Sequence, residues 1–195
     1  MDFPLDLRFK LFAVSSQISV TDPQGRVVYY VKQKAFKLKE AVTVFADEGQ
    51  TRELYRIAAD RILDISARYR IEDAGGAELV VLERQGMRSF WRVHYGIHQE
   101  GRPTFVIHEE NPWVKLLDGV IGSIPIVSLF TGYFLHPAYL VSRGEDQPPL
   151  LRLVKRPALL EGRFRIDAIG RADGLSIDVA VLSLLMMLLI ERARG

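Results

Sequence analysis

Residues 174–190 read GLSIDVAVLSLLMMLLI, and the last twelve of them contain one polar side chain, Ser183, and no charge. At about 100° per residue the apolar side chains surround the helix axis, whereas a surface helix keeps a polar stripe. Asp173 and Ser176 offer oxygens for an N-cap, and arginines beyond Ile190 suit the negative end of the helix dipole. The stretch is therefore predicted to be a helix buried on every side, by lipid or by the protein's own body.

Turn signals recur at a spacing of 25 or 26 residues, at 22–25, 47–50, 73–76 and 99–102. Each combines Asp or Gln with Gly, the chemistry of hairpin turns that need a positive φ. Between the turns, apolar and polar side chains alternate with the period of two that is typical of half-buried strands. This alternation predicts a series of antiparallel hairpins with one apolar face.

Twelve strands are predicted in this way, at 8–14, 16–21, 26–34, 41–46, 51–58, 65–72, 78–84, 89–98, 103–109, 138–143, 150–155 and 162–169. So many strands favour closure into a barrel, whose interior is too wide for side chains alone to fill. A helix about 25 Å long, at 1.5 Å per residue, would fill it. We therefore predict a mainly β fold, a closed antiparallel barrel of about twelve strands around a buried apolar C-terminal helix at about 174–192. The alternative is a membrane-anchoring tail helix, although the run is short for a bilayer and would enclose Asp178.

The 195 residues suit a single domain spanning residues 1–195. A short helix and an apolar loop interrupt the strand pattern at about 111–137; we expect this loop to pack over a barrel mouth, with contact to a membrane as an open alternative. The 26 basic and 24 acidic residues leave a net charge of +2, so no nucleic-acid partner is expected. The chain has no cysteine, which excludes disulfides and thiolate chemistry. The N-terminus does not resemble a secretory signal, so we expect a cytoplasmic protein, with peripheral membrane attachment left open.

Three segments carry a resemblance to a known family: DPQGRVVYYVKQKAFKLKE at 22–40, EGRFRID at 161–167 and LLMMLLI at 184–190. Together with the barrel layout they resemble bacterial LURP-one-related proteins, in the superfamily of Tubby C-terminal-like domains and phospholipid scramblases. The resemblance implies the barrel with its central helix, a scramblase-like fold, and it suggests phospholipid binding. Scramblase activity is not implied, because the palmitoylated cysteines and the calcium segment of scramblases have no counterpart here. The resemblance therefore predicts fold better than function.

Three of the four histidines, His94, His98 and His108, fall within fifteen residues. If the turn between them centres on Gly101, His94 lies opposite His108, with His98 on the same face. Such a group could bind a transition metal through its imidazole nitrogens. The simpler interpretation is three rings on the solvent face of a hairpin, so no metal site is assigned.

Basic residues form two groups, which could contact anionic lipid. The residues proposed for this role are Lys32, Lys34, Lys155, Arg156, Arg163 and Arg165. The alternative is that they form the polar outer face that any exposed strand requires. The sequence does not say whether the two groups share one surface.

No nucleophile elbow, P-loop, dinucleotide motif or zinc-protease motif is present. We therefore assign no catalytic residue and no cofactor. The expected function is a non-enzymatic binding or adaptor domain that recognises anionic phospholipid or phosphoinositide at a membrane surface, or a protein partner. The alternatives are a metal-binding protein or enzyme using the histidine hairpin, and a protein anchored by its C-terminal helix. The oligomeric state stays open.

Overall fold

The structure is a computed structural model that describes residues 1–10, 15–34, 41–61, 68–85, 94–99, 104–110, 138–158, 161–171 and 175–194. The elements in these ranges are β1 Leu5–Lys10, β2 Ser15–Thr21, β3 Val27–Lys34, β4 Val42–Phe45, β5 Glu53–Arg61, β6 Arg68–Asp73, β7 Glu78–Arg84, β8 His94–His98, β9 Phe105–Glu109, β10 Ala138–Ser142, β11 Leu151–Arg156, β12 Glu161–Ala168 and helix α2, Ile177–Arg194. The predicted insertion at 111–137, the turn at Gly101 and the proposed cap Asp173 lie outside the described residues. The single domain over residues 1–195 stays a prediction.

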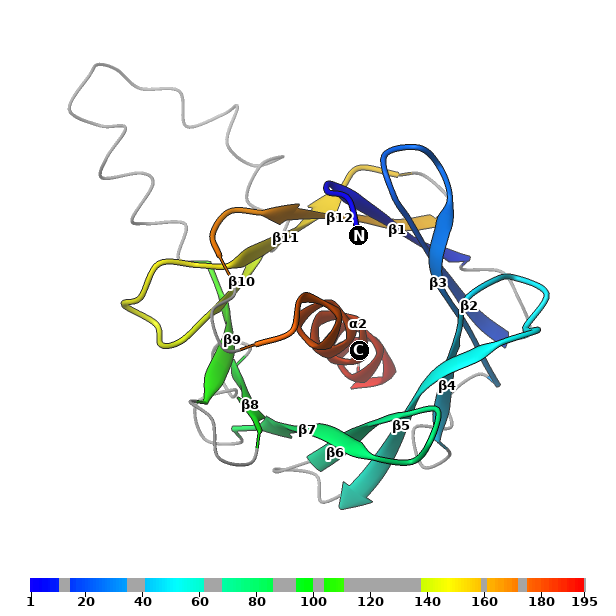
Figure 1. The fold of residues 1–195 in the computed structure, drawn as a ribbon. Helices are drawn as coiled ribbons and strands as arrows, with labels where there is room; N and C mark the ends of the chain where they lie inside the picture. Colours follow the sequence, from blue (N-terminus) through cyan, green and yellow to red (C-terminus); the bar gives the residue numbers. More distant parts are fainter. Residues whose placement is uncertain are drawn as a thin grey trace.

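The strands form one closed antiparallel barrel in which each strand pairs with its neighbours in the chain (Figure 1). Closure comes from β1 and β12, which pair from Leu5 opposite Ile166 to Lys10 opposite Glu161. This confirms the predicted fold class. The first strand begins at Leu5 rather than Arg8, because the alternation of buried and exposed side chains already starts there.

Three of the predicted turns are stabilised by the aspartate at their first position. In the β2–β3 turn, Asp22 Oδ1 accepts hydrogen bonds from the backbone N–H groups of Gln24 and Arg26, at 3.0 and 2.9 Å. In the β6–β7 turn, Asp73 Oδ1 accepts one from Ala77 at 2.9 Å. These are Asx turns, in which a short carboxylate side chain accepts hydrogen bonds from backbone N–H groups of the turn that have no partner on a neighbouring strand. The positive φ falls on the expected glycine in these two turns, but the β4–β5 turn places it on Gln50 (φ 58°) rather than on its glycine.

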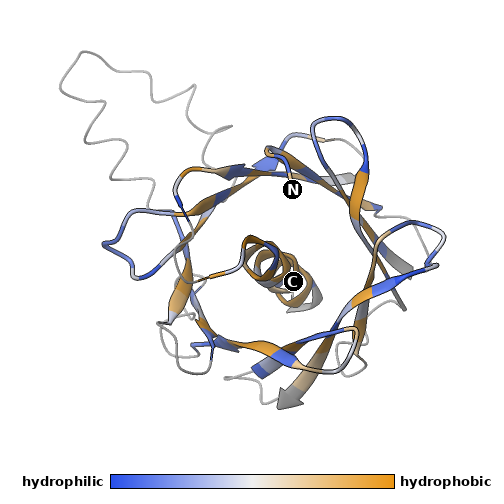
Figure 2. Cartoon of the chain, in the orientation of Figure 1, coloured by the Kyte–Doolittle hydropathy of each residue, from blue (hydrophilic) through white to orange (hydrophobic). Residues whose placement is uncertain are grey.

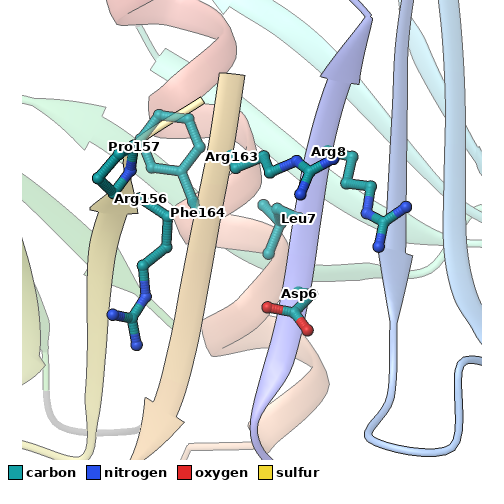
Figure 3. A pocket seen from close by; sticks show the side chains of 7 residues that line it. All are labelled: Asp6, Leu7, Arg8, Arg156, Pro157, Arg163 and Phe164. Atoms are coloured by element: carbon teal, nitrogen blue, oxygen red, sulfur yellow. The ribbon is translucent and has the colours of Figure 1, made fainter. Parts of the chain in front are cut away.

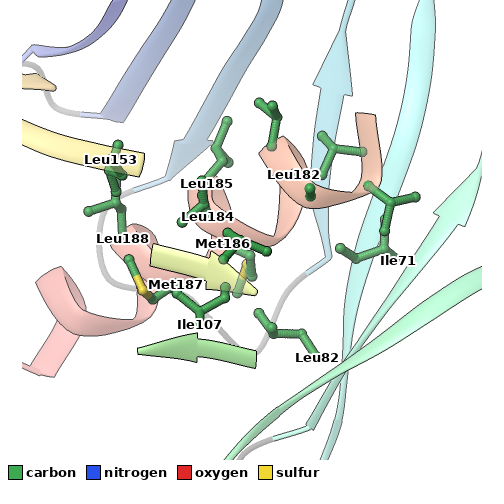
Figure 4. Close-up of a cluster of buried hydrophobic side chains, with 14 of the residues drawn as sticks. Ile71, Leu82, Ile107, Leu153, Leu182, Leu184, Leu185, Met186, Met187 and Leu188 are labelled. Carbon is green, nitrogen blue, oxygen red and sulfur yellow. The ribbon is translucent and has the colours of Figure 1, made fainter. Parts of the chain in front are cut away.

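Helix α2 occupies the centre of the barrel (Figure 1). All twelve residues from Val179 to Ile190 are buried, and seven of them are fully inaccessible. Leu185 and Met187 pack among strand side chains such as Ile71 and Ile107, which point inward (Figure 4). The apolar residues of the strands alternate along the wall with hydrophilic ones (Figure 2). Burial of each such side chain contributes about 1.5–3 kcal/mol, so the helix and the inner wall stabilise each other.

The alternative of a membrane-anchoring tail helix is wrong for this structure. The barrel wall encloses α2, so the protein itself provides the apolar surroundings that a bilayer would provide. Across the described ranges, no helix has the length and hydropathy needed to cross a membrane.

Polar contacts hold α2 at both ends. Near its N-terminus, Asp178 accepts a hydrogen bond from the hydroxyl of Tyr29 on β3. Near its C-terminus, Glu191 accepts one from the hydroxyl of Tyr95 at 2.5 Å and lies 3.4 Å from the guanidinium of Arg84. Glu191 would otherwise be disfavoured at the negative end of the helix dipole, and these two partners offset that cost.

Candidate functional site

Three arginines lie side by side on the outer face of neighbouring strands. Arg163 on β12 is directly opposite Arg156 on β11 and also directly opposite Arg8 on β1. Directly paired residues of antiparallel strands have Cα atoms about 4.5–5.5 Å apart. All three side chains are exposed. We call Arg8, Arg163 and Arg156 the arginine row.

The arginine row borders a shallow depression of about 190 Å³. Its lining residues are Asp6, Leu7, Arg8, Arg156, Pro157, Arg163 and Phe164. Figure 3 shows Arg163 extending from β12 towards β1, with the other two arginines on either side. The depression thus combines three cations with a small apolar wall.

Two lysines, Lys10 and Lys32, lie on the same surface as the arginine row. Lys10 is two residues along β1 from Arg8 and therefore shares its outer face. Gln17 on β2 is opposite both Lys10 and Lys32 on β3. We call Arg8, Lys10, Lys32, Arg156 and Arg163 the basic surface. It spans β11 to β3, four steps of about 4.8 Å or about 19 Å around the wall.

The two basic groups of the sequence therefore share one side of the barrel, a relation that the sequence left open. Arg8 and Lys10, which join them, were missed by the sequence reasoning. The signal was the alternating stretch LDLRFK at 5–10, in which Leu5, Leu7 and Phe9 are buried and the residues between them are exposed. The predicted first strand began at residue 8, so the alternation from residue 5 onwards was not recognised.

The remaining proposed residues are placed differently. Arg165 Nε donates to Asp167 Oδ1 at 2.8 Å, and this hydrogen bond raises the pKa of the guanidinium further above its ordinary value. Lys155 is exposed, but it pairs with Phe164 and alternates with Arg156, so it lies off the arginine row. Lys34 pairs with Ser15 at the end of β3, and its side chain lies outside the described residues.

The histidines do not converge on one point. His94 lies opposite His108, as predicted from the turn. His98 instead has its Nδ1 3.3 Å from the hydroxyl of Thr104 and its Nε2 3.8 Å from Glu83. In the described part of the chain, no group of three or more His, Cys, Asp or Glu could hold a metal ion.

The expectation that all three histidines face solvent is wrong for His94. This ring is only 6% exposed, and its Nε2 lies 2.9 Å from Glu145 Oε1 in the turn between β10 and β11. The contact is an ion pair only when the His94 ring is protonated. Burial lowers the pKa of the neighbouring His108, and the His94 ring also lowers it, while nearby carboxylates such as Glu145 partly oppose this. The pair is a packed part of the wall.

Comparison with known proteins gives a family and a fold. Residues 27–119 match the model of the LURP-one-related family, which confirms the family suggested by the sequence. A protein from Arabidopsis thaliana, known from its X-ray structure, has a similar fold with a TM-score of 0.50 and 14% sequence identity. The alignment covers 97% of this chain and 91% of the plant protein. No curated protein matches this sequence.

Proposed function

From the LURP-one-related family to which residues 27–119 belong, and from the placement of its basic residues, we propose that this protein is a non-enzymatic binding domain that attaches to anionic phospholipid surfaces. The observation that carries the proposal is the arginine row, in which Arg163 is flanked by Arg8 and Arg156. All three of its members, and every residue of the basic surface except Lys32, lie outside the matched residues, so the argument uses this chain's own geometry.

The arginine row places like charges directly opposite each other on neighbouring strands. Like charges directly opposite each other on neighbouring strands destabilise a sheet, on a scale of about 0.2–1 kcal/mol per pair. The outer face of a strand needs only polar side chains, and residues of mixed charge would provide them without repulsion between like charges. Single pairs of like charge also occur elsewhere on the barrel, as in Arg61 opposite Arg68. The arginine row differs in that three neighbouring strands each contribute an arginine at the same level, and this concentration of cations supports a role in binding an anion.

The energetics suit a reversible attachment. A basic residue close to an anionic bilayer contributes about 1 kcal/mol. The attraction fades within a Debye length of about 10 Å at 0.1 M salt. The five residues of the basic surface spread over about 19 Å of a curved wall, so only some of them contact a flat bilayer at once. The expected attachment is weak and sensitive to salt.

The position of α2 supports an external site. Barrels of this size hold ligands in their lumen when the lumen is open, whereas here apolar side chains of α2 such as Leu182 and Leu185 fill it. A ligand must therefore bind on the outside, where the basic surface lies.

The proposal is tested by flotation with vesicles of phosphatidylcholine, with and without phosphatidylserine, at low and high salt. We expect wild-type protein to float only with phosphatidylserine and only at low salt. The double variant Lys10→Gln/Lys32→Gln removes two charges, or about 2 kcal/mol, so binding should fall about 30-fold.

The matched control is Arg56→Gln/Arg68→Gln, which removes two exposed charges from β5 and β6 on the opposite side of the barrel (Figure 1). This variant should bind as wild type does. No flotation of the wild type, or an equal loss in both double variants, would refute the proposal and leave a protein partner as the function to test.

A further inference from the structure

We infer that the barrel stands on an anionic bilayer with the end at which α2 finishes, and that it leans towards the basic surface. The inference rests on the proposed function, because the partner is the same anionic phospholipid. It adds the direction in which the barrel faces the bilayer, and it brings Lys155 and Arg192 into the contact.

The direction of α2 defines the two ends of the barrel. The turns after β2, β4 and β6 lie at the end where α2 begins, since Asp178 in its first turn accepts the hydrogen bond from Tyr29, near the start of β3. At the other end, Glu191 in the last turn of α2 contacts Tyr95, near the start of β8, and Arg84 at the end of β7. Dividing each strand and α2 at its midpoint assigns every described residue to one half of the barrel.

The described charges are polarised along the barrel axis. The half in which α2 ends contains thirteen basic and six acidic residues, a formal charge of 13 − 6 = +7, and we call it the basic half. The half with the hairpin turns contains seven basic and thirteen acidic residues, or 7 − 13 = −6, and we call it the acidic half. Both sums count arginines together with the carboxylates that they contact, so neither depends on an unpaired side chain.

Exposure follows the same division. In the basic half the five residues of the basic surface are exposed, and so are Arg68, Lys155 and Arg192. The acidic side chains of this half, where the structure describes them, are all partly buried. Glu110, for example, accepts a hydrogen bond from the guanidinium of Arg152 at 2.9 Å. The basic half therefore presents mainly cations to an approaching surface.

Local structure explains only part of this polarity. Asp22, Asp47 and Asp73 stabilise turns, and without them the acidic half still has a charge of −3. Arg192 and Arg194 suit the negative end of the helix dipole. The other eleven basic residues of the basic half are all on strands, where neither role applies.

Screening favours an end-on contact over one along the wall. The eight residues of β12 extend about 27 Å at 3.4 Å per residue, or about 20 Å along the axis of a barrel with tilted strands. This is about twice the Debye length of 8–10 Å, so an end-on contact uses the basic half and leaves most of the acidic half screened. A contact along the wall brings both halves close to the bilayer, with a combined charge of only 7 − 6 = +1.

Lys155 and Arg192 lie at the mouth of the basic half rather than on its outer wall. Lys155 follows the buried Leu151 and Leu153 in the alternation of β11, so it is on the inward face, yet it is exposed near the end of the strand. Arg192 belongs to the central helix, and its guanidinium lies 5.5 Å from the centre of the Phe9 ring on β1. A bilayer can contact these two residues only at the end of the barrel.

The basic surface sets the direction in which the barrel leans. Its five residues occupy β11 to β3, on one side of the basic half. Arg68 is on β6, on the opposite side of the barrel (Figure 1), where Glu83 lies 3.8 Å away. Leaning towards the basic surface brings its cations closer to the bilayer and lifts Arg68 away from it.

The first experiment removes the two cations that only an end-on contact reaches. Flotation with phosphatidylserine vesicles at low salt compares the wild type with Lys155→Gln/Arg192→Gln. Binding should weaken about 30-fold, which corresponds to about 2 kcal/mol for two charges. The matched control, Arg52→Gln/Arg171→Gln, removes two exposed charges from the acidic half and should bind as the wild type does. Melting followed by circular dichroism verifies that each barrel is intact.

The second experiment measures the orientation directly. The chain has no cysteine, so one introduced cysteine carries a fluorescent label at a single position. Ala158→Cys lies after β11 in the basic half, and Ile169→Cys lies after β12 in the acidic half on the same side of the barrel; both positions are exposed. With a spin-labelled lipid headgroup as quencher, the label at 158 should be quenched and the label at 169 should not.

The outcomes separate this inference from the proposed function. Suppose that the wild type floats and Lys10→Gln/Lys32→Gln does not, while Lys155→Gln/Arg192→Gln floats as the wild type does. The inference is then overturned and the proposed function stands. Equal quenching at the two labelled positions, or quenching at 169 alone, would likewise overturn the end-on orientation. A wild type that binds no vesicles overturns both.

Discussion

Leu185→Ala tests whether the central helix holds the barrel together. Leu185 is fully buried in the lumen, among side chains from the helix and the wall (Figure 4). The substitution removes three carbon atoms, or about 2.4 kcal/mol at 0.8 kcal/mol for each. The surrounding closed sheet cannot collapse freely, so a residual cavity adds about 1 kcal/mol or more. We expect a loss of about 3–4 kcal/mol in the free energy of unfolding.

For a chain of this size, 1 kcal/mol lowers the melting temperature by about 2–4 °C. The Leu185→Ala variant should therefore melt about 6–16 °C below the wild type when unfolding is followed by circular dichroism. The control is Ile169→Ala, which truncates a side chain that is 52% exposed and should change the melting temperature by less than about 2 °C. If the two variants melted within about 2 °C of each other, the central role of α2 would be refuted.

Three further results are expected. Ser183→Ala should raise the melting temperature by about 2–4 °C, because the buried Ser183 hydroxyl has no hydrogen-bond partner among the described residues and its removal recovers about 1 kcal/mol. A drop of several degrees would show that the hydroxyl is bonded. Tyr95→Phe should cost about 1.5–3 kcal/mol in chemical denaturation, because it removes a hydrogen bond to the charged Glu191, and an unchanged midpoint would contradict this. Burial raises the pKa of Tyr139 to about 12 and also raises that of Tyr29. An unfolded tyrosine ionises at about pH 10, so above this pH the folded state binds more protons than the unfolded state. The free energy of unfolding should therefore fall as the pH rises above about 10. Tyrosinate absorbance and circular dichroism should change together in an alkaline titration, and early ionisation without loss of the fold would argue against these burials.

The strands could be predicted because their signal is local. In β6, Tyr69 and Ile71 are buried and Arg70 between them is not, as the period of two requires. The helix could be predicted for a related reason: a run such as Val179 to Ile190 has no polar stripe and must be enclosed. Once twelve strands and one such helix are counted, closure of the barrel around the helix follows from geometry.

The features that were missed depend on residues far apart in the chain. Asp178 was interpreted only as an obstacle to a membrane span, because its partner Tyr29 lies 149 residues away. His94 lies opposite His108 as predicted, but it is buried and lies close to Glu145, which comes from a distant turn.

The arginine row is a third case of this kind. It exists only because β1 pairs with β12, which brings Arg8 beside Arg163. Alternation along one strand carries no information about such pairings, so the sequence could suggest the basic residues without showing that they meet.

The order of elements along the chain has a consequence for synthesis. All twelve strands precede α2, so a growing chain carries an unfilled apolar wall until the helix leaves the ribosome. The seam between β1 and β12 likewise waits for residues 161–168. Loops this long close slowly, and open strand edges favour aggregation during the delay. The nascent protein should therefore depend on chaperones until translation passes α2, and it should gain resistance to proteases in one late step rather than strand by strand.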